Sequence, residues 1–167
     1  TCWGPGIAND GFLQRFLYEE GDYKEVEIGG IGTSIEICLL NSTGRLACYA
    51  SGDAFYYSDS AKGLNGLKGH FCLIDMGKIE CWGNNGNQQV SNTPDWTNFT
   101  KVSTGTSHTC GLTSSKHLEC WGSIGHVWHP HPEPGEYLDV ASGNVETCYI
   151  KLDRTVECIG RGNWGNG

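Results

Sequence analysis

A pair of cysteines nine or ten residues apart recurs four times along this chain, and this repeat constrains the fold more than any other feature. The first members are Cys38, Cys72, Cys110 and Cys148, and the second members are Cys48, Cys81, Cys120 and Cys158. Each second cysteine opens a Cys-Trp-Gly phrase, intact at 81–83 and 120–122 and degenerate at 48–50 and 158–160, and another intact copy stands at 2–4. The copies start 46, 33, 39 and 38 residues apart. A period of this length predicts a tandem array of similar structural units.

Each cysteine pair flanks a predicted β-hairpin. With the two cysteines opposite each other, the turns fall at residues 42–44, 76–77, 114–116 and 152–154. Gly44 suits the left-handed backbone of a three-residue turn, and the two-residue turn explains the shorter spacing of the second pair. Directly opposite residues on antiparallel strands lie about as far apart as a disulfide requires. We therefore predict the disulfides Cys38–Cys48, Cys72–Cys81, Cys110–Cys120 and Cys148–Cys158.

A further strand is predicted upstream of three of the hairpins, at 23–28, 99–103 and 137–141, where residues alternate as in half-buried strands. The corresponding stretch 61–66 is glycine-rich and predicts an eroded unit. The sequence thus indicates an all-β chain of three- or four-stranded antiparallel sheets. Helix is expected only as a short turn within 10–19.

The assembled unit resembles the repeat of the regulator-of-chromosome-condensation family of β-propellers. The resemblance is carried by Thr106-Ser107-His108-Thr109-Cys110-Gly111-Leu112 followed by Leu118-Glu119-Cys120-Trp121-Gly122. This segment is most similar to the cysteine-bearing secreted form of the repeat, seen in ectodomains of crinkly-type receptor kinases. The resemblance implies a propeller, commonly with about seven blades of four short strands. The nucleotide-exchange role of nuclear family members does not fit an oxidised chain with glycosylation sequons.

Four hairpins are too few to close a seven-bladed ring, so we expect a single repeat domain over 1–167 that forms an incomplete propeller. Its approximate repeats are 2–47, 48–80, 81–119 and 120–157, with a partial repeat at 158–167. Cys2 belongs to the second-cysteine series but has only Thr1 before it, so its partner is expected elsewhere. Three completions stay open: missing chain, a neighbouring copy packed head to tail, or a small self-closed ring.

Composition and net charge restrict the cellular locations and the binding partners that are expected for this chain. The net charge of -8 disfavours nucleic acid and anionic membranes, and no run of about 18 apolar residues could span a bilayer. None of the nine cysteines lies within the short C-x₂₋₄-C spacing typical of zinc sites, so disulfides and an oxidising, extracellular location are expected.

Several residues are candidates for modification or binding. The sequons Asn41-Ser42-Thr43 and Asn98-Phe99-Thr100 predict N-linked glycans at Asn41 and Asn98. The cluster His126, His129 and His131 could hold a metal, but an exposed loop stiffened by proline is the favoured interpretation. The repeat tryptophans Trp3, Trp82 and Trp121 are expected to pack between blades. The possible binding residues lie in the variable loops: Trp96, Trp128, His129, His131 and Trp164.

These features favour a secreted, disulfide-rich glycoprotein with a structural, adhesive or self-assembling role. The alternatives are a lectin-like or protein-binding module, or a fragment of a receptor ectodomain. No set of nucleophile, histidine and carboxylate stands out, so neither enzymatic activity nor a cofactor, apart from covalent glycans, is expected. The predicted partner is protein, in the form of copies of this chain or missing chain that completes the propeller, with glycans as a further possibility.

Overall fold

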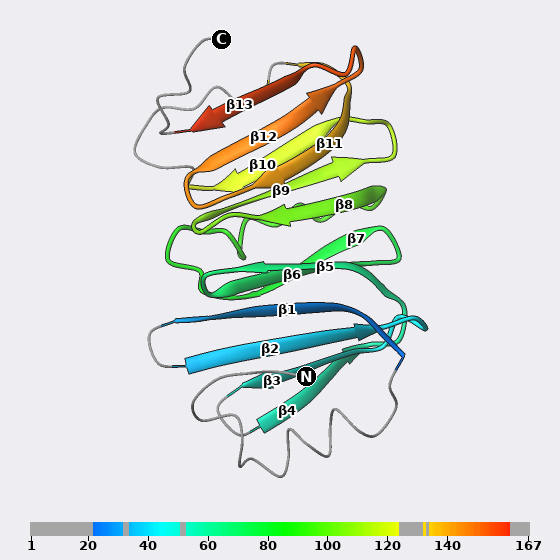
Figure 1. Ribbon diagram of the computed structural model, residues 1–167, viewed down its shortest axis with the longest axis vertical. Helices are drawn as coiled ribbons and strands as arrows, with labels where there is room; N and C mark the ends of the chain where they lie inside the picture. The colour runs from blue at the N-terminus through cyan, green and yellow to red at the C-terminus, as the bar shows by residue number, and fades with distance from the viewer. Residues whose placement is uncertain (1–21, 32–33, 51–52, 124–131, 133, 161–167) are drawn as a thin grey trace.

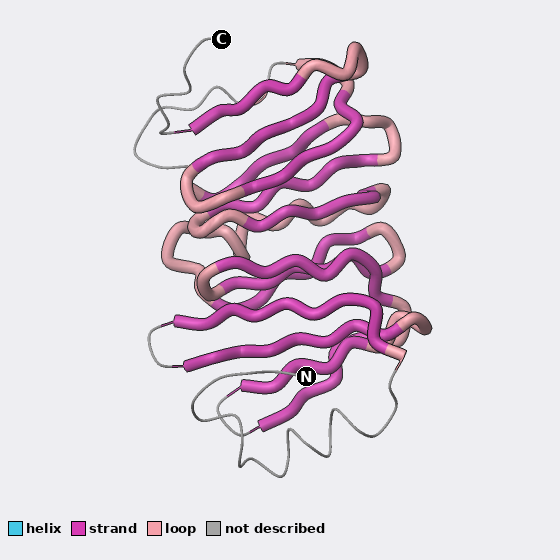
Figure 2. The backbone as a smooth tube through the Cα atoms, viewed as in Figure 1, coloured by secondary structure: helices cyan, strands magenta, loops and turns pink. Residues whose placement is uncertain are grey.

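The computed structural model describes residues 22–31, 34–50, 53–123, 132 and 134–160. This part of the chain is entirely β-structure and turns, as Figure 2 shows. Its strands form four antiparallel sheets, each built from consecutive strands, which lie one above another along the long axis of the molecule (Figure 1). The prediction of an all-β stack of propeller-type blades is therefore confirmed.

We number the sheets as blades in chain order. Blade 1 contains β1 (Tyr23–Ile31), β2 (Ser34–Asn41), β3 (Leu46–Ala50) and β4 (Asp53–Ser58). Blade 2 contains β5 (Ala61–Leu67), β6 (His70–Asp75) and β7 (Lys78–Gly83). Blade 3 contains β8 (Phe99–Thr104), β9 (His108–Thr113) and β10 (Leu118–Gly122). Blade 4 contains β11 (Tyr137–Ser142), β12 (Glu146–Lys151) and β13 (Val156–Gly160).

The cysteine register of the hairpins is the predicted one. In every blade the two cysteines lie directly opposite each other, and Asp75 pairs with Lys78 across the two-residue turn of blade 2. All four expected disulfides are present, with Cα–Cα distances of 4.0 to 4.1 Å. Gly44 has a φ of +93°, the left-handed backbone expected in its turn. Because a strand register and a turn are local features, spacing alone was enough to predict them.

The expectation of an eroded blade 2 is wrong. Residues 61–66 lie within β5, which follows β4 directly in the chain. The register of β5 shifts between Lys62 and Asn65, so the strand loses the two-residue alternation by which strands are recognised. Its backbone is fixed instead by pairing with β6 and by the Ala61 N–H, which donates to the Gly44 carbonyl of blade 1 at 2.9 Å.

Most of the hydrophobic core lies between the blades, and one smaller cluster around Ile37 and Leu39 lies within blade 1. Between blades 1 and 2, the Cys38–Cys48 disulfide packs with Leu40, Leu46 and Phe71. The same arrangement recurs at the two following boundaries, where the disulfides of blades 2 and 3 face the next blade in the stack. Trp121 is buried and Trp82 stacks on Phe71, with ring centroids 5.7 Å apart, as expected for repeat tryptophans. Each blade is thus stabilised mainly by its neighbour.

Candidate functional site

The boundaries between blades repeat one set of side-chain bonds, which defines how a blade recognises its neighbour. Opposite the first cysteine, Asn65 Oδ1 accepts from the Thr104 N–H at 2.7 Å. In the next blade Ser103 Oγ takes the same position and accepts from the Ser142 N–H at 2.8 Å. Each bond connects the first strand of one blade to the first strand of the next.

A second bond comes from the residue two positions before the first cysteine. His70 Nε2 lies 2.9 Å from Thr109 Oγ1, and one blade later His108 Nε2 lies 2.8 Å from Thr147 Oγ1. Both imidazoles are fully buried, and burial lowers the pKa of His70 to about 4, although a hydrogen bond to the His108 backbone acts in the opposite direction. In blade 1, Glu36 stands at this position and accepts from Trp82 Nε1 at 2.7 Å.

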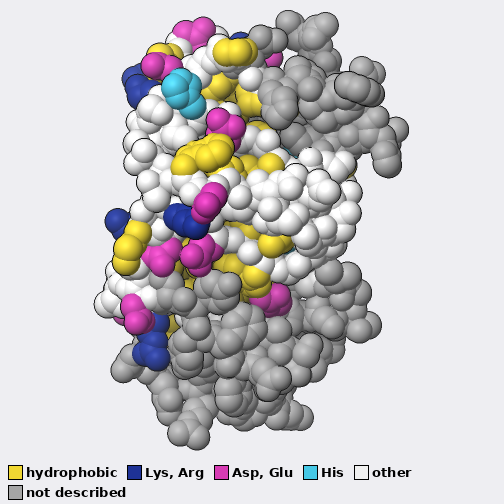
Figure 3. Space-filling model, turned by 180° about the vertical axis from the view of Figure 1, so that it is seen from behind, with side chains coloured by type: hydrophobic (Ala, Val, Ile, Leu, Met, Phe, Trp, Pro, Cys, Tyr) yellow, Lys and Arg dark blue, Asp and Glu magenta, His cyan; other side chains and the backbone are white. Residues whose placement is uncertain are grey.

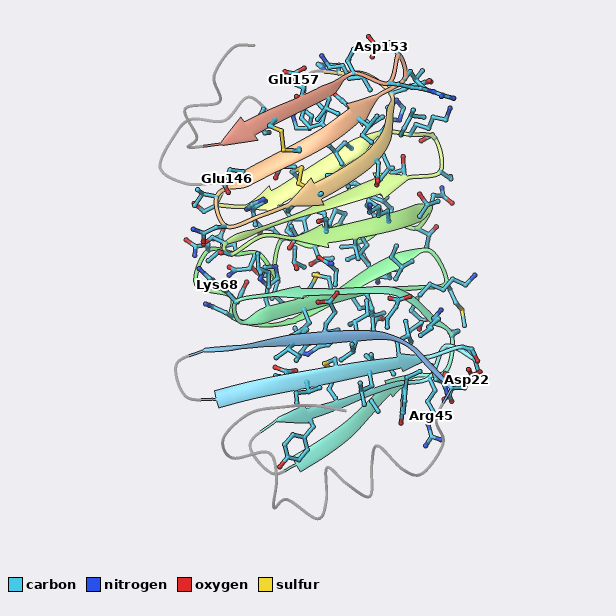
Figure 4. The ribbon with its side chains drawn as sticks, in the orientation of Figure 1. Asp22, Arg45, Lys68, Glu146, Asp153 and Glu157 are labelled. Carbon is cyan, nitrogen blue, oxygen red and sulfur yellow. A yellow bond between two sulfur atoms is a disulfide. The ribbon has the colours of Figure 1, made fainter. Side chains whose placement is uncertain are left out.

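The outer face of blade 4, turned away from blade 3, is built like the faces that bind a neighbour. By strand register it carries the Cys148–Cys158 disulfide, Ile150 and Val156. Both cysteines are only half-buried and the side chain of Val156 is 65% exposed. Ala141 and Glu146 occupy the two positions that form the bonds at the other boundaries, and Figure 4 shows Glu146 at the opposite end of this blade from Asp153. We call this surface the blade 4 end face.

The exposure of the blade 4 end face predicts the order in which the disulfides are reduced. Under limiting reductant, we expect Cys148–Cys158 to open before Cys38–Cys48, because both cysteines of the latter are fully buried. Alkylation during a reduction time course, followed by peptide mass spectrometry, measures the order. Earlier labelling of Cys38 and Cys48 would contradict the prediction.

The opposite end of the stack also exposes apolar side chains. In β1, Glu25 faces blade 2, where its Oε2 accepts from the Leu64 N–H at 2.8 Å. Burial raises the pKa of Glu27 on the same face, assisted by the charge of Glu25 and opposed by a backbone hydrogen bond from Gly66. The alternating residues Val26 and Ile28 therefore point away from blade 2, and they are 56% and 60% exposed. We call this surface the blade 1 end face.

A third exposed surface lies at the edge where the hairpin turn of blade 2 meets the segment before β8. Met76 at the turn is 84% exposed, and Trp96 is 52% exposed. Lys78 and Asp95 form an ion pair of 2.8 Å beside an open depression of about 430 Å³. A hydrogen bond from Lys78 lowers the pKa of Asp95, and the reciprocal bond raises that of Lys78. Among the predicted loop residues, Trp96 is therefore placed on the surface.

Both sequon asparagines are described, whereas several other predicted residues are not. Asn41 is half-buried at the tip of the blade 1 hairpin and Asn98 is exposed just before β8. The turn expected within 10–19 and the histidine at 126 lie outside the described residues, as do Cys2, Trp3, Trp128, His129, His131 and Trp164.

Within the described ranges, one group of potential metal ligands lies close together: Glu36, Cys38 and Cys48. Both sulfurs belong to a disulfide and Glu36 accepts from Trp82, so this cluster offers no thiolate to an ion. In the same part of the chain, no helix has the length and apolar character needed to cross a membrane. Figure 3 shows acidic and basic side chains interspersed over the described part of one face, with apolar side chains between them.

Sequence reasoning identified the disulfides and expected an incomplete propeller with open ends, but it did not name the residues of the two end faces or the buried histidines. A signal for the blade 4 end face was available: Cys148, Ile150 and Val156 stand at repeat positions whose counterparts face the next blade. Whether a neighbour covers them depends on the tertiary arrangement, which a repeat alignment does not contain.

Comparison with known proteins supports the assignment of the repeat. Residues 99–123, which include β8, β9 and β10, match the family model of the regulator of chromosome condensation (RCC1) repeat. No curated protein sequence matches this chain.

Solved structures of propellers share the fold at low sequence identity. The CRINKLY WD40 ectodomain of the Arabidopsis thaliana receptor kinase ACR4 superposes with a TM-score of 0.66 at 21% identity, over 86% of this chain and 54% of that one. The ectodomain of the Physcomitrella patens receptor kinase CR4 gives 0.66 at 18% identity, over 85% and 42%. Yeast RCC1, solved with Kap60, gives 0.61 at 16% identity, over 77% and 40%. This chain therefore spans about half the length of these structures or less, and its resemblance to RCC1-type propeller blades is confirmed.

Proposed function

We propose that this chain is a secreted structural module that assembles head to tail, with the blade 4 end face of one copy bound to the blade 1 end face of the next. The observation that carries the proposal is the half-buried disulfide of blade 4. The three equivalent disulfides lie in cores between blades. Cys148–Cys158 and Val156 occupy the equivalent positions of blade 4, but there the surface is exposed.

The distribution of exposed apolar side chains supports contact between the two ends. Among the described residues, five of the seven large hydrophobic side chains that are exposed belong to the end blades: Val26, Ile28, Leu138, Leu152 and Val156. A contact between unlike ends would continue the geometry of the internal boundaries, and such heterologous contacts produce rings or filaments. Protein binding also occurs among similar structures, since yeast RCC1 was solved bound to Kap60.

The four disulfides support an oxidising compartment, since such bonds persist in secreted proteins. The similarity to receptor-kinase ectodomains is consistent with an extracellular location.

Aspartate substitutions, one at each end face, test this proposal. We expect the mass of the wild-type chain in sedimentation to rise with concentration, and Val156→Asp or Val26→Asp to abolish this rise, because each buries an unpaired charge at the contact. A mixture of the two variants should form a dimer and stop there, since each variant keeps one intact end. Met76→Asp, at an exposed turn outside both end faces, is the matched control and should associate like the wild type.

A wild-type chain that stays monomeric at every concentration would refute head-to-tail assembly. Association that survives both end-face substitutions would place the contact on another surface, which also contradicts the proposal.

A further inference from the structure

The second sequon stands beside an exposed aromatic side chain. Its segment reads Trp96-Thr97-Asn98-Phe99-Thr100, in which Trp96, Asn98 and Thr100 are all exposed. We propose that Asn98 carries an N-linked glycan and that the first sugar of this glycan packs against the ring of Trp96. This inference shares only the secretory location with the proposed assembly and does not depend on either end face.

The backbone of Asn98 is fixed between two hairpin turns. The Phe99 N–H donates to the Gly77 carbonyl of blade 2 at 2.9 Å, and the Asn98 carbonyl accepts from the Ser114 N–H of blade 3 at 2.7 Å. Asn98 has a φ of +95°, in the range that asparagine tolerates better than most residues with a Cβ. An exposed asparagine is thus held in a defined place relative to its chain neighbours.

The Trp96 ring is anchored in a way that suits a platform for a sugar. It stacks on Phe99, with ring centroids 6.3 Å apart and planes inclined by 22°, and Phe99 belongs to the core between blades 2 and 3. Half of the Trp96 side chain remains exposed. The C–H groups on one face of a pyranose are weakly positive, so they are attracted to the electron-rich face of an indole. Because the ring is already anchored, little side-chain entropy is lost when the sugar packs on it.

The first sequon lacks this arrangement and provides an internal control. The residue two positions before Asn41 is Leu39, which is buried and aliphatic. Asn41 Oδ1 accepts from the Thr43 hydroxyl at 2.8 Å and from the Arg45 N–H at 2.8 Å, so this side chain organises its own turn. A glycan on Asn41 Nδ2 would leave that oxygen free to keep both bonds, but would find no aromatic ring at the equivalent position.

The covalent step is a transfer of oligosaccharide from a polyprenyl diphosphate to Asn98. The Asn98 Nδ2 atom attacks the anomeric carbon C1, so that a C1–Nδ2 bond forms. The C1–O bond to the diphosphate breaks, and the polyprenyl diphosphate leaves with that electron pair. One Nδ2 proton passes to a base of the transferase.

The experiment combines occupancy with a double-mutant cycle. The chain is produced in a eukaryotic secretory host, Asn98 occupancy is measured by glycopeptide mass spectrometry, and an endoglycosidase trims each glycan to one N-acetylglucosamine. Asn98 should be occupied, and the sugar should raise Tm by about 2 °C relative to Asn98→Gln. In the Trp96→Ala background this increment should vanish, whereas Trp96→Phe should keep most of it.

The matched cycle at Asn41 separates a specific contact from a general effect of glycans. Asn41→Gln should change Tm by the same amount with and without Trp96→Ala. An unoccupied Asn98, or a sugar increment that persists in Trp96→Ala, would overturn the inference. Neither result would bear on head-to-tail assembly, which is read separately by sedimentation.

Discussion

Replacement of Gly122 by alanine is expected to lower the free energy of unfolding by about 3 kcal/mol. Gly122 ends the Cys-Trp-Gly phrase of blade 3 with a φ of +88°, and a Cβ there would lie 2.6 Å from the Ser107 carbonyl oxygen. The next residue, Ser123, donates its N–H to that same oxygen at 2.8 Å. Alanine would therefore combine an unfavourable backbone conformation with a clash against main-chain atoms, which cannot rotate away.

The same geometry recurs at Gly83 and Gly160, which explains why glycine ends the phrase in three blades. At both positions φ is positive, and an added Cβ would meet the carbonyl oxygen of Gly69 or Val145 even more closely. In blades 2 and 3, the tryptophan and cysteine of the phrase pack between blades. In all three blades, glycine lets the end of the third strand approach the start of the second.

Thermal unfolding measures the effect of Gly122→Ala. For a chain of this size, about 3 kcal/mol corresponds to a fall in Tm of about 9 °C. Gly86→Ala is the control, because an added Cβ at Gly86 meets only the Asn84 side chain, at 3.3 Å, and its φ is not in the left-handed range. Equal values of Tm for the two variants would show that the close approach at Gly122 does not contribute to stability.

How much the sequence reveals differs between local and tertiary features. The cysteine spacing predicted the disulfides, the hairpin register and the turn at Met76-Gly77, because all three depend on residues within one hairpin. Trp121 was predicted as core because it recurs at one repeat position. In contrast, β5 escaped prediction because a bulge disrupts its alternation, and its order comes from partners in blade 1 and β6.

The candidate surfaces could not be predicted from the sequence repeat, because they depend on which tertiary neighbours cover each residue. In the sequence, Val156 and Ile150 have the pattern of ordinary strand residues. They belong to an end face only because no further blade is described beyond blade 4. The sequence predicted Trp96 as a possible binding residue in a variable loop, but its stacking on Phe99 could be seen only in the structure. His70 gave no sign of burial, since a histidine in a strand is as compatible with the surface as with the core.

Acidification from pH 7 to pH 4 is expected to remove up to about 3 kcal/mol of stability through His70 alone. Burial lowers the pKa of His70 in the folded chain to about 4, against an ordinary value of 6.5. Between these values the unfolded chain binds more protons, so stability is complete above about pH 6.5 and falls as the pH decreases to about 4. Protonation would place a charge in the boundary between blades 2 and 3, where His70 now bonds Thr109.

Glu27 acts in the opposite direction, and a histidine variant separates the two effects. Its pKa is raised, chiefly by burial, so folding favours the neutral carboxyl and acid stabilises the blade 1 and 2 boundary. His70→Gln keeps a neutral polar side chain at every pH and leaves Glu27 in place. Urea unfolding at pH 7, 5.5 and 4 should therefore show a steeper loss for the wild type than for His70→Gln. The difference should appear below pH 6.5, because only the wild type has an imidazole at position 70 that gains a proton on unfolding. Parallel losses of stability would mean that the fold does not hold the His70 imidazole neutral.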